Sequence, residues 1–166
     1  MIPMLFSEVR VTAVADTPVL LLREQEGTRH LAVWITAAGG NAILSALEET
    51  DPEHPNTHDL MIEALAILDG VVESVHITGI DEGVYTAHLV VGGSVVPARV
   101  SDAVALALRC GATILADEDL IDAVAVHATS AEVPMAEGVP DEQLEEFRAF
   151  LDTINPEDFG PTHGQP

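Results

Sequence analysis

The clearest structural pattern in this sequence is the stretch Arg99-Val-Ser-Asp-Ala-Val-Ala-Leu-Ala-Leu-Arg109. A Ser-Asp pair followed by a run of Ala, Val and Leu is typical of a helix start that leads into a buried helix, so we predict a helix from about Ser101 to Cys110. The apolar segment 94–98 directly before it predicts a short strand. The unit is therefore a strand, a tight turn and a helix.

A second copy of this unit lies earlier in the chain. Segment 41–47, Asn-Ala-Ile-Leu-Ser-Ala-Leu, aligns with segment 102–108, Asp-Ala-Val-Ala-Leu-Ala-Leu, and an apolar strand at 31–35 precedes it. Segment 9–14 aligns in the same way with segment 75–80. These matches indicate an internal repeat.

The repeat and the hydrophobic patterning predict an α+β fold. We expect a duplicated β-β-β-α unit with largely antiparallel strands, an extra helix between the copies and a C-terminal acidic helix. The predicted strands are 5–14, 19–22, 31–35, 71–80, 84–91, 94–98 and 112–116; the predicted helices are 37–48, 57–68, 101–110 and 117–124.

The domain organisation follows from composition. Residues 1–127 carry the periodic apolar pattern and form the main domain, and residues 128–140 contain small residues and prolines without periodicity, which is typical of a linker. Residues 141–154 predict an acidic amphipathic helix, and 155–166 a flexible tail.

The charge balance is extreme. The 166 residues include 28 acidic and 6 basic side chains, a formal net charge of −22, while 48% hydrophobic residues suffice for a core. The electric field of so negative a chain repels phosphate backbones and disfavours nucleic acid as a partner. There is no long apolar run and no signal-like N-terminus, and the lone Cys110 fits a reducing compartment. We therefore expect a cytoplasmic protein without membrane contact.

Two helix starts carry the candidate chemistry. At Thr57-His58-Asp59, His58 could act as an acid or base while Asp59 holds a divalent metal or orients the histidine. The alternative is structural: Thr57 caps the helix and Asp59 complements its dipole. At the second start, Ser101 and Asp102 are again good capping residues.

Arg99 is less easily explained by capping. It lies at the end of an apolar strand, where an arginine either pairs with a carboxylate, Asp59 or Asp102, or binds phosphate.

Two histidines lie on neighbouring predicted strands. A three-residue turn at 81–83 would place His76 opposite His88 and Thr78 opposite Thr86, with the apolar residues between them on the other face. The histidines could share a metal, or they could simply form the solvent face of the hairpin, since the sequence fixes no third ligand.

Together, the motif Thr57-His-Asp-Leu60 and the stretch 99–109 resemble the bifunctional nuclease family, the domain of unknown function 151 group. The resemblance covers about residues 3–127, and Val100 stands where that family commonly has proline. It implies a duplicated α+β domain, often dimeric, with DNase and RNase activity. The acidic C-terminal helix resembles an extension of actinobacterial members.

Carried onto this sequence, the resemblance implies phosphodiester hydrolysis. The catalytic residues would be His58, Asp59, Arg99 and Asp102, with Asp59 and Asp102 as ligands of Mg²⁺ or Mn²⁺. Thr57, Ser101 and Arg109 would contact the substrate.

Two other functions stay open. One is a non-catalytic, dimeric interaction protein whose acidic helix binds a basic partner; the other is a sensor that binds a small anion at the helix starts.

Overall fold

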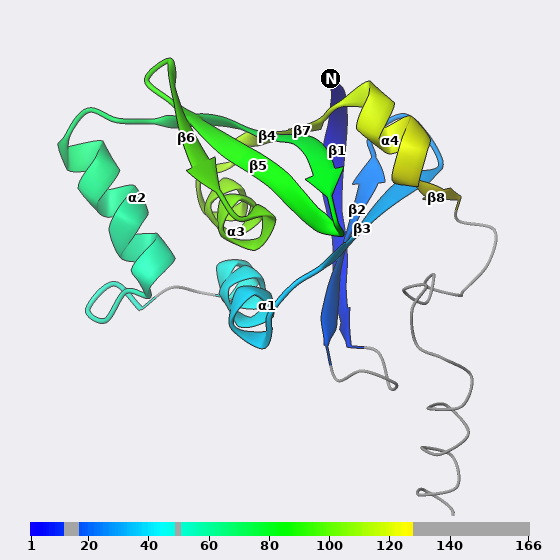
Figure 1. Cartoon of the computed structure of the whole chain (residues 1–166). Coiled ribbons are helices and arrows are strands. Elements are labelled where there is room, and N and C mark those ends of the chain that lie inside the picture. The colour runs from blue at the N-terminus through cyan, green and yellow to red at the C-terminus, as the bar shows by residue number, and fades with distance from the viewer. Residues whose placement is uncertain (12–16, 49–50, 128–166) are drawn as a thin grey trace, which may run out of the picture. The chain divides into compact units, whose positions relative to one another are not determined.

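One eight-stranded sheet organises the chain in a computed structural model that describes residues 1–11, 17–48 and 51–127 (Figure 1). Its strand order is β6-β5-β4-β7-β1-β2-β3-β8, and every neighbouring pair is antiparallel except β4 and β7. The strands are β1 (Ile2–Val11), β2 (Pro18–Glu24), β3 (Arg29–Trp34), β4 (Val72–Asp81), β5 (Val84–Val91), β6 (Ser94–Ala98), β7 (Thr113–Ala116) and β8 (Val126–His127). The α+β class predicted from the sequence is confirmed.

The two halves have the same element order. The meander β1-β2-β3 leads into α1 (Ala37–Leu44), and the meander β4-β5-β6 leads into α3 (Val100–Cys110). Between them lie a 3₁₀ turn, Ser45–Leu47, and the extra helix α2 (Thr57–Ile67). This arrangement is compatible with a duplicated unit. The helix α4 (Glu118–Val124) and the short β8 follow, whereas the predicted linker, acidic helix and tail lie outside the described residues.

Helix α3 is the centre of the core, as the stretch 99–109 predicted. It packs against α1, α2, β4 and β5, and seven of its eleven residues are buried. Small Ala side chains let these neighbours approach it closely from several sides. The buried set is Val100, Ser101, Ala103, Val104, Ala105, Leu106 and Ala107. Gly111 ends the helix with φ of 72°, a left-handed conformation that glycine adopts without steric cost.

The helix starts differ in detail from the sequence prediction. Helix α3 begins one residue early, at Val100, so that Ser101 lies in its first turn rather than at the cap; the capping position is Arg99, whose side chain makes no capping bond. Helix α2 is capped at Asn56 rather than Thr57, again without a side-chain capping bond. Capping therefore does not account for Ser101 or Thr57.

The hairpin β4-β5 corrects the predicted turn. His76 lies opposite His88, as expected, with ring centroids 5.1 Å apart. The turn, however, has two residues, Glu82 and Gly83, both with positive φ. A bulge between Ile77 and Gly79 absorbs the extra residue, so Thr86 pairs with Gly79 rather than Thr78.

The helices of the described residues are all too short or too polar to cross a membrane.

Candidate functional site

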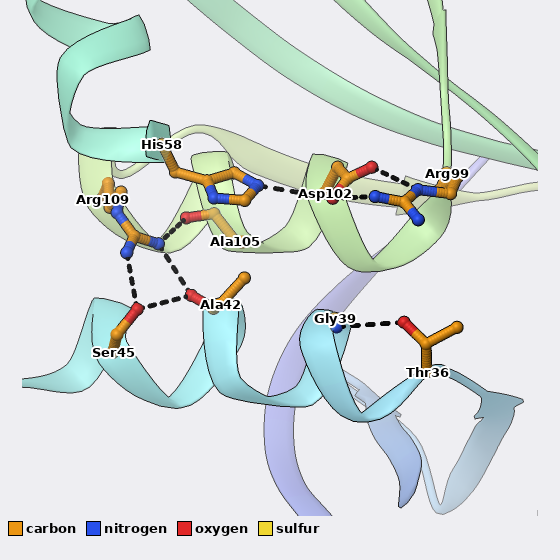
Figure 2. A network of polar contacts seen from close by, with 9 residues as sticks. All are labelled: Thr36, Gly39, Ala42, Ser45, His58, Arg99, Asp102, Ala105 and Arg109. Atoms are coloured by element: carbon orange, nitrogen blue, oxygen red, sulfur yellow. Dashed lines mark hydrogen bonds and ion pairs between the residues drawn. The ribbon is translucent and has the colours of Figure 1, made fainter. Parts of the chain in front are cut away.

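Helices α2 and α3 bring His58 and Asp102 together. The two residues are 44 positions apart in the sequence, yet His58 Nε2 lies 3.4 Å from Asp102 Oδ1. Both side chains are partly accessible, with exposed fractions of 19% and 27%. Figure 2 shows Asp102 between the imidazole of His58 and the guanidinium of Arg99. A histidine oriented by a carboxylate is a common arrangement for proton transfer.

Arg99 holds the other side of the same carboxylate. Its Nε donates to Asp102 Oδ2 at 2.6 Å and its Nη2 donates to Oδ1 at 3.0 Å, a two-bonded clamp within the first turn of α3. These hydrogen bonds raise the pKa of the Arg99 guanidinium above its usual value. The Arg99 side chain is 69% exposed, so it can still face an anion in solution.

Asp59 and Arg109 form a separate, buried pair. Arg109 Nε donates to Asp59 Oδ1 at 2.6 Å, and the two side chains are only 6% and 8% exposed. Burial alone would raise the pKa of Asp59, but the hydrogen bond and charge of Arg109 outweigh it and hold that pKa below its usual value. The carboxylate is therefore ionised at neutral pH inside the fold.

Arg109 also ties α3 to α1. Its Nη1 donates to the carbonyl oxygens of Ala42 and Ala105, both at 2.9 Å, and its Nη2 donates to Ser45 Oγ at 2.8 Å (Figure 2). With Asp59 contributed by α2, this one guanidinium connects three helices. The structure thus separates the predicted site residues into a partly exposed group, His58, Asp102 and Arg99, and a buried group, Asp59 and Arg109.

Ser101 and Thr57, the remaining predicted residues, have different surroundings. Thr57 is exposed at the first position of α2. Ser101 is only 6% exposed and lines a pocket of about 190 Å³ beside Arg99. Gly39 of α1 packs against it so closely that a Cβ on Gly39 would lie 2.8 Å from Ser101 Oγ.

The pocket also contains residues that no sequence motif pointed to. Its walls come from the end of β3, the β4-β5 turn, the start of β5 and the start of α3. The lining residues are Val33, Trp34, Ile35, Thr36, Gly83, Val84, Tyr85, Arg99, Val100 and Ser101. The sequence did contain a signal for two of these residues, because Trp34 and Tyr85 are the chain's single tryptophan and single tyrosine.

The carboxylates do not fit a preformed metal site in this arrangement. Mg²⁺ and Mn²⁺ prefer carboxylate oxygens, but Asp59 Oδ1 accepts from Arg109 and both oxygens of Asp102 accept from Arg99. In the described part of the chain, no cluster of three or more His, Cys, Asp or Glu side chains could hold a metal. The requirement for Mg²⁺ or Mn²⁺ stays a prediction.

Comparison with known proteins agrees with this fold and these motifs. The model of the bifunctional nuclease domain matches residues 20–129, and the chain belongs to that family. It is also 35% identical over 156 residues to the uncharacterized protein Rv1829 of Mycobacterium tuberculosis strain H37Rv and to the uncharacterized protein MT1877 of strain CDC 1551. Each match covers 93% of this chain and 95% of the relative.

Proposed function

We propose that this protein cleaves phosphodiester bonds of nucleic acids, with His58, Asp102 and Arg99 as its catalytic site. The observation that carries the proposal is the position of Asp102, which contacts both a partly exposed histidine and an exposed arginine. Membership in the bifunctional nuclease domain family supports the reaction class. The three groups supply what such a reaction needs: a base, a group that orients it, and a cation for the phosphate.

The roles follow from the contacts. If His58 Nε2 carries the proton that faces Asp102 Oδ1, then Nδ1 keeps its lone pair and acts as the general base. It removes a proton from the attacking hydroxyl or water as the new phosphorus–oxygen bond forms, while the bond from phosphorus to the leaving oxygen breaks and that oxygen takes a proton from water. Arg99 uses Nε and Nη2 for Asp102. Its Nη1, which donates to no group among residues 1–11, 17–48 and 51–127, stabilises the charge on the phosphate.

We assign Asp59 and Arg109 a structural role in this scheme. Their side chains are 8% and 6% exposed, and they already bind each other. A substrate would have to break a buried ion pair to reach either one, which is energetically costly. The pair instead fixes α2 against α3 and so sets the position of His58.

The proposal is tested by a cleavage assay on single- and double-stranded DNA and RNA, with Mg²⁺, with Mn²⁺ and with a chelator. Asp102→Asn is expected to lower kcat about tenfold to a hundredfold, because it removes the charge that orients and stabilises the His58 imidazolium. Asp122→Asn is the matched control, since Asp122 also pairs with an arginine, Arg29, but lies in α4. Equal kcat for wild type and Asp102→Asn, or absence of cleavage in both, would refute the proposal.

A second function, self-association, is favoured by the surface of α2. Several large apolar side chains of α2 and its neighbouring segments are solvent-exposed, and clusters of this kind mark interaction surfaces. They are Leu44 43%, Leu47 56%, Leu60 55%, Met61 42%, Ile67 82%, Leu68 77% and Val71 66%. A second copy of the chain would bury these apolar side chains. The basic partner predicted for the acidic helix 141–154 stays a prediction.

Sedimentation velocity tests self-association. The wild type is expected to sediment as a dimer and Ile67→Glu as a monomer, because a carboxylate introduced among these apolar side chains must be desolvated on association. Val84→Glu, at a valine of β5 that is 71% exposed, is the control and should leave the sedimentation coefficient unchanged. A monomeric wild type would exclude the dimer.

A further inference from the structure

The pocket beside Arg99 is lined by the chain's scarcest side chains. Only 4% of the residues are aromatic, yet the single tryptophan, Trp34, and the single tyrosine, Tyr85, both line this one cavity. Trp34 is 39% exposed at the end of β3. Tyr85 is held in place because its hydroxyl donates to the carbonyl of Ala32 at 3.0 Å. The cavity therefore has an accessible indole and a fixed phenol ring.

The pocket lining includes a hydroxyl that is available to a ligand, that of Ser101. Ser101 is 94% buried (6% exposed), it lines the cavity, and within residues 1–11, 17–48 and 51–127 its hydroxyl has no hydrogen-bond partner. Its oxygen is not among the fully buried side-chain atoms that lack a partner, so the hydroxyl is accessible to a ligand atom in the cavity. Ser101 also lies in the first turn of α3, whose N-terminal N–H groups receive no side-chain cap. Such N–H groups bind phosphate or carboxylate oxygens.

The local charge differs from the charge of the whole chain. The formal net charge is −22, but none of the lining residues is acidic and the one charged lining residue is Arg99. The pocket can thus accept an anionic group that the rest of the surface repels.

We propose that this pocket binds one unpaired nucleotide of a single-stranded nucleic acid. The base stacks on Trp34, and its phosphate accepts hydrogen bonds from Ser101 and from the start of α3, beside the guanidinium of Arg99. The identity of the ligand as a nucleic acid rests on the proposed function. The pocket adds the substrate class, a single strand. Binding here places the neighbouring phosphodiester next to Arg99 and Asp102.

The size of the pocket argues for an unpaired base. Its volume of about 190 Å³ is below the roughly 300 Å³ at which sites for drug-sized ligands begin, so it holds one base but not a base pair. A base inside a duplex is stacked on both faces and cannot reach an indole at the protein surface without being extruded. Single strands present their bases without that cost.

Fluorescence of Trp34 measures this binding directly, because the chain has one tryptophan. The probes are a short single-stranded oligonucleotide, its duplex, a nucleoside 5′-phosphate and ribose 5-phosphate, each titrated into the full-length protein in low salt with a chelator. The single strand and the nucleotide are expected to quench the emission. The duplex and ribose 5-phosphate should bind at least about tenfold more weakly, since neither offers a base for stacking.

Two variants locate the site, with binding followed by anisotropy of a labelled single strand. Trp34→Leu is expected to weaken binding about 5- to 150-fold, the equivalent of one lost base stack. Ser101→Ala should weaken it about tenfold through the lost hydrogen bond to a charged group. Val95→Ala, which removes an exposed apolar side chain of β6 outside the pocket lining, is the control and should bind as the wild type does.

Binding and cleavage can fail independently. If the quenching occurs but no phosphodiester is cut, the pocket is a nucleotide site and the proposed nuclease function is wrong. If the duplex or ribose 5-phosphate binds as tightly as the single strand, or Trp34→Leu binds as the wild type does, the pocket proposal is overturned whatever the cleavage assay shows.

Discussion

Replacing Arg109 with methionine is expected to lower the free energy of unfolding by about 3–5 kcal/mol. The change leaves the Asp59 carboxylate buried, at 8% exposure, without the guanidinium that binds it. It also removes the hydrogen bonds that join α3 to Ala42 and Ser45 of the α1 region. Urea denaturation of both proteins at neutral pH, followed by far-ultraviolet circular dichroism, measures the difference.

A double variant separates charge burial from lost packing. Arg109→Met combined with Asp59→Leu is expected to be more stable than Arg109→Met alone, because the uncompensated buried charge is gone. The single variant Asp59→Leu completes the comparison. If the loss in free energy of unfolding of the double variant equals the sum of the losses of the two single variants, the two residues do not interact and the structural role assigned to them is wrong.

The pH dependence of this pair has a definite sign. The pKa of Asp59 is lowered in the folded wild type, so its contribution to stability is complete above the unfolded value of about 3.9 and is lost as pH falls below it. In Arg109→Met, burial dominates and raises the pKa of Asp59, so that variant gains stability relative to the wild type on acidification. The difference in free energy of unfolding between the two proteins should therefore begin to narrow above about pH 4, as Asp59 of the variant takes up a proton, and narrow further below it, as the wild type loses its stabilised carboxylate.

Replacing His58 with glutamine is expected to lower kcat for nucleic-acid cleavage about 10²- to 10⁴-fold, the usual contribution of a general base. Glutamine keeps a polar group near Asp102 Oδ1 but cannot take up a proton. The His58 imidazole is 19% exposed and does not line the pocket at Trp34, so binding of the single strand should be unchanged. Single-turnover cleavage and the fluorescence titration together measure both quantities.

His54 is the matched control for this experiment. It too faces an aspartate, with Nδ1 3.1 Å from Asp51 Oδ2, but its side chain is 81% exposed and it lies outside the helices. His54→Gln is expected to cleave at the wild-type rate. Equal losses of kcat in the His54 and His58 variants would mean that the substitutions act through a general effect on the protein, and that His58 is not a general base.

The fold was largely predictable because its signals are local. Alternation of polar and apolar residues identified the two meanders, and the Ala-rich stretch 99–109 identified the buried helix. The β4-β5 turn was not predictable to the residue, because a bulge after Ile77 shifts the register without changing the apolar pattern. The two-residue strand β8 has too few residues for any periodicity, and it forms only through its pairing with β3.

The candidate site was predictable in its residue types but not in its pairings. The sequence offered two carboxylates for Arg99. Arg99 binds Asp102 within the first turn of α3, and the packing of α2 on α3 pairs Asp59 with Arg109 instead. The motif gave no reason to expect that Arg109 is 6% exposed, since arginines at helix ends are usually solvated. Trp34 belongs to the pocket only because the β4-β5 turn reaches the end of β3.

The position of β7 has a consequence for how the chain folds. β7 lies between β1 and β4, where Ile2–Met4 pairs with Ile114–Ala116 and Ser74–Ile77 pairs with Thr113–Ala116. The two meanders are built from neighbouring segments and can form early, but nothing joins them in one sheet until residues 113–116 arrive. Until that point of synthesis, β1 and β4 each keep an open edge of unpaired backbone groups. Closure of the sheet is therefore a late event that links the beginning of the chain to its last strands, and a chain cut before residue 113 would keep two exposed edges.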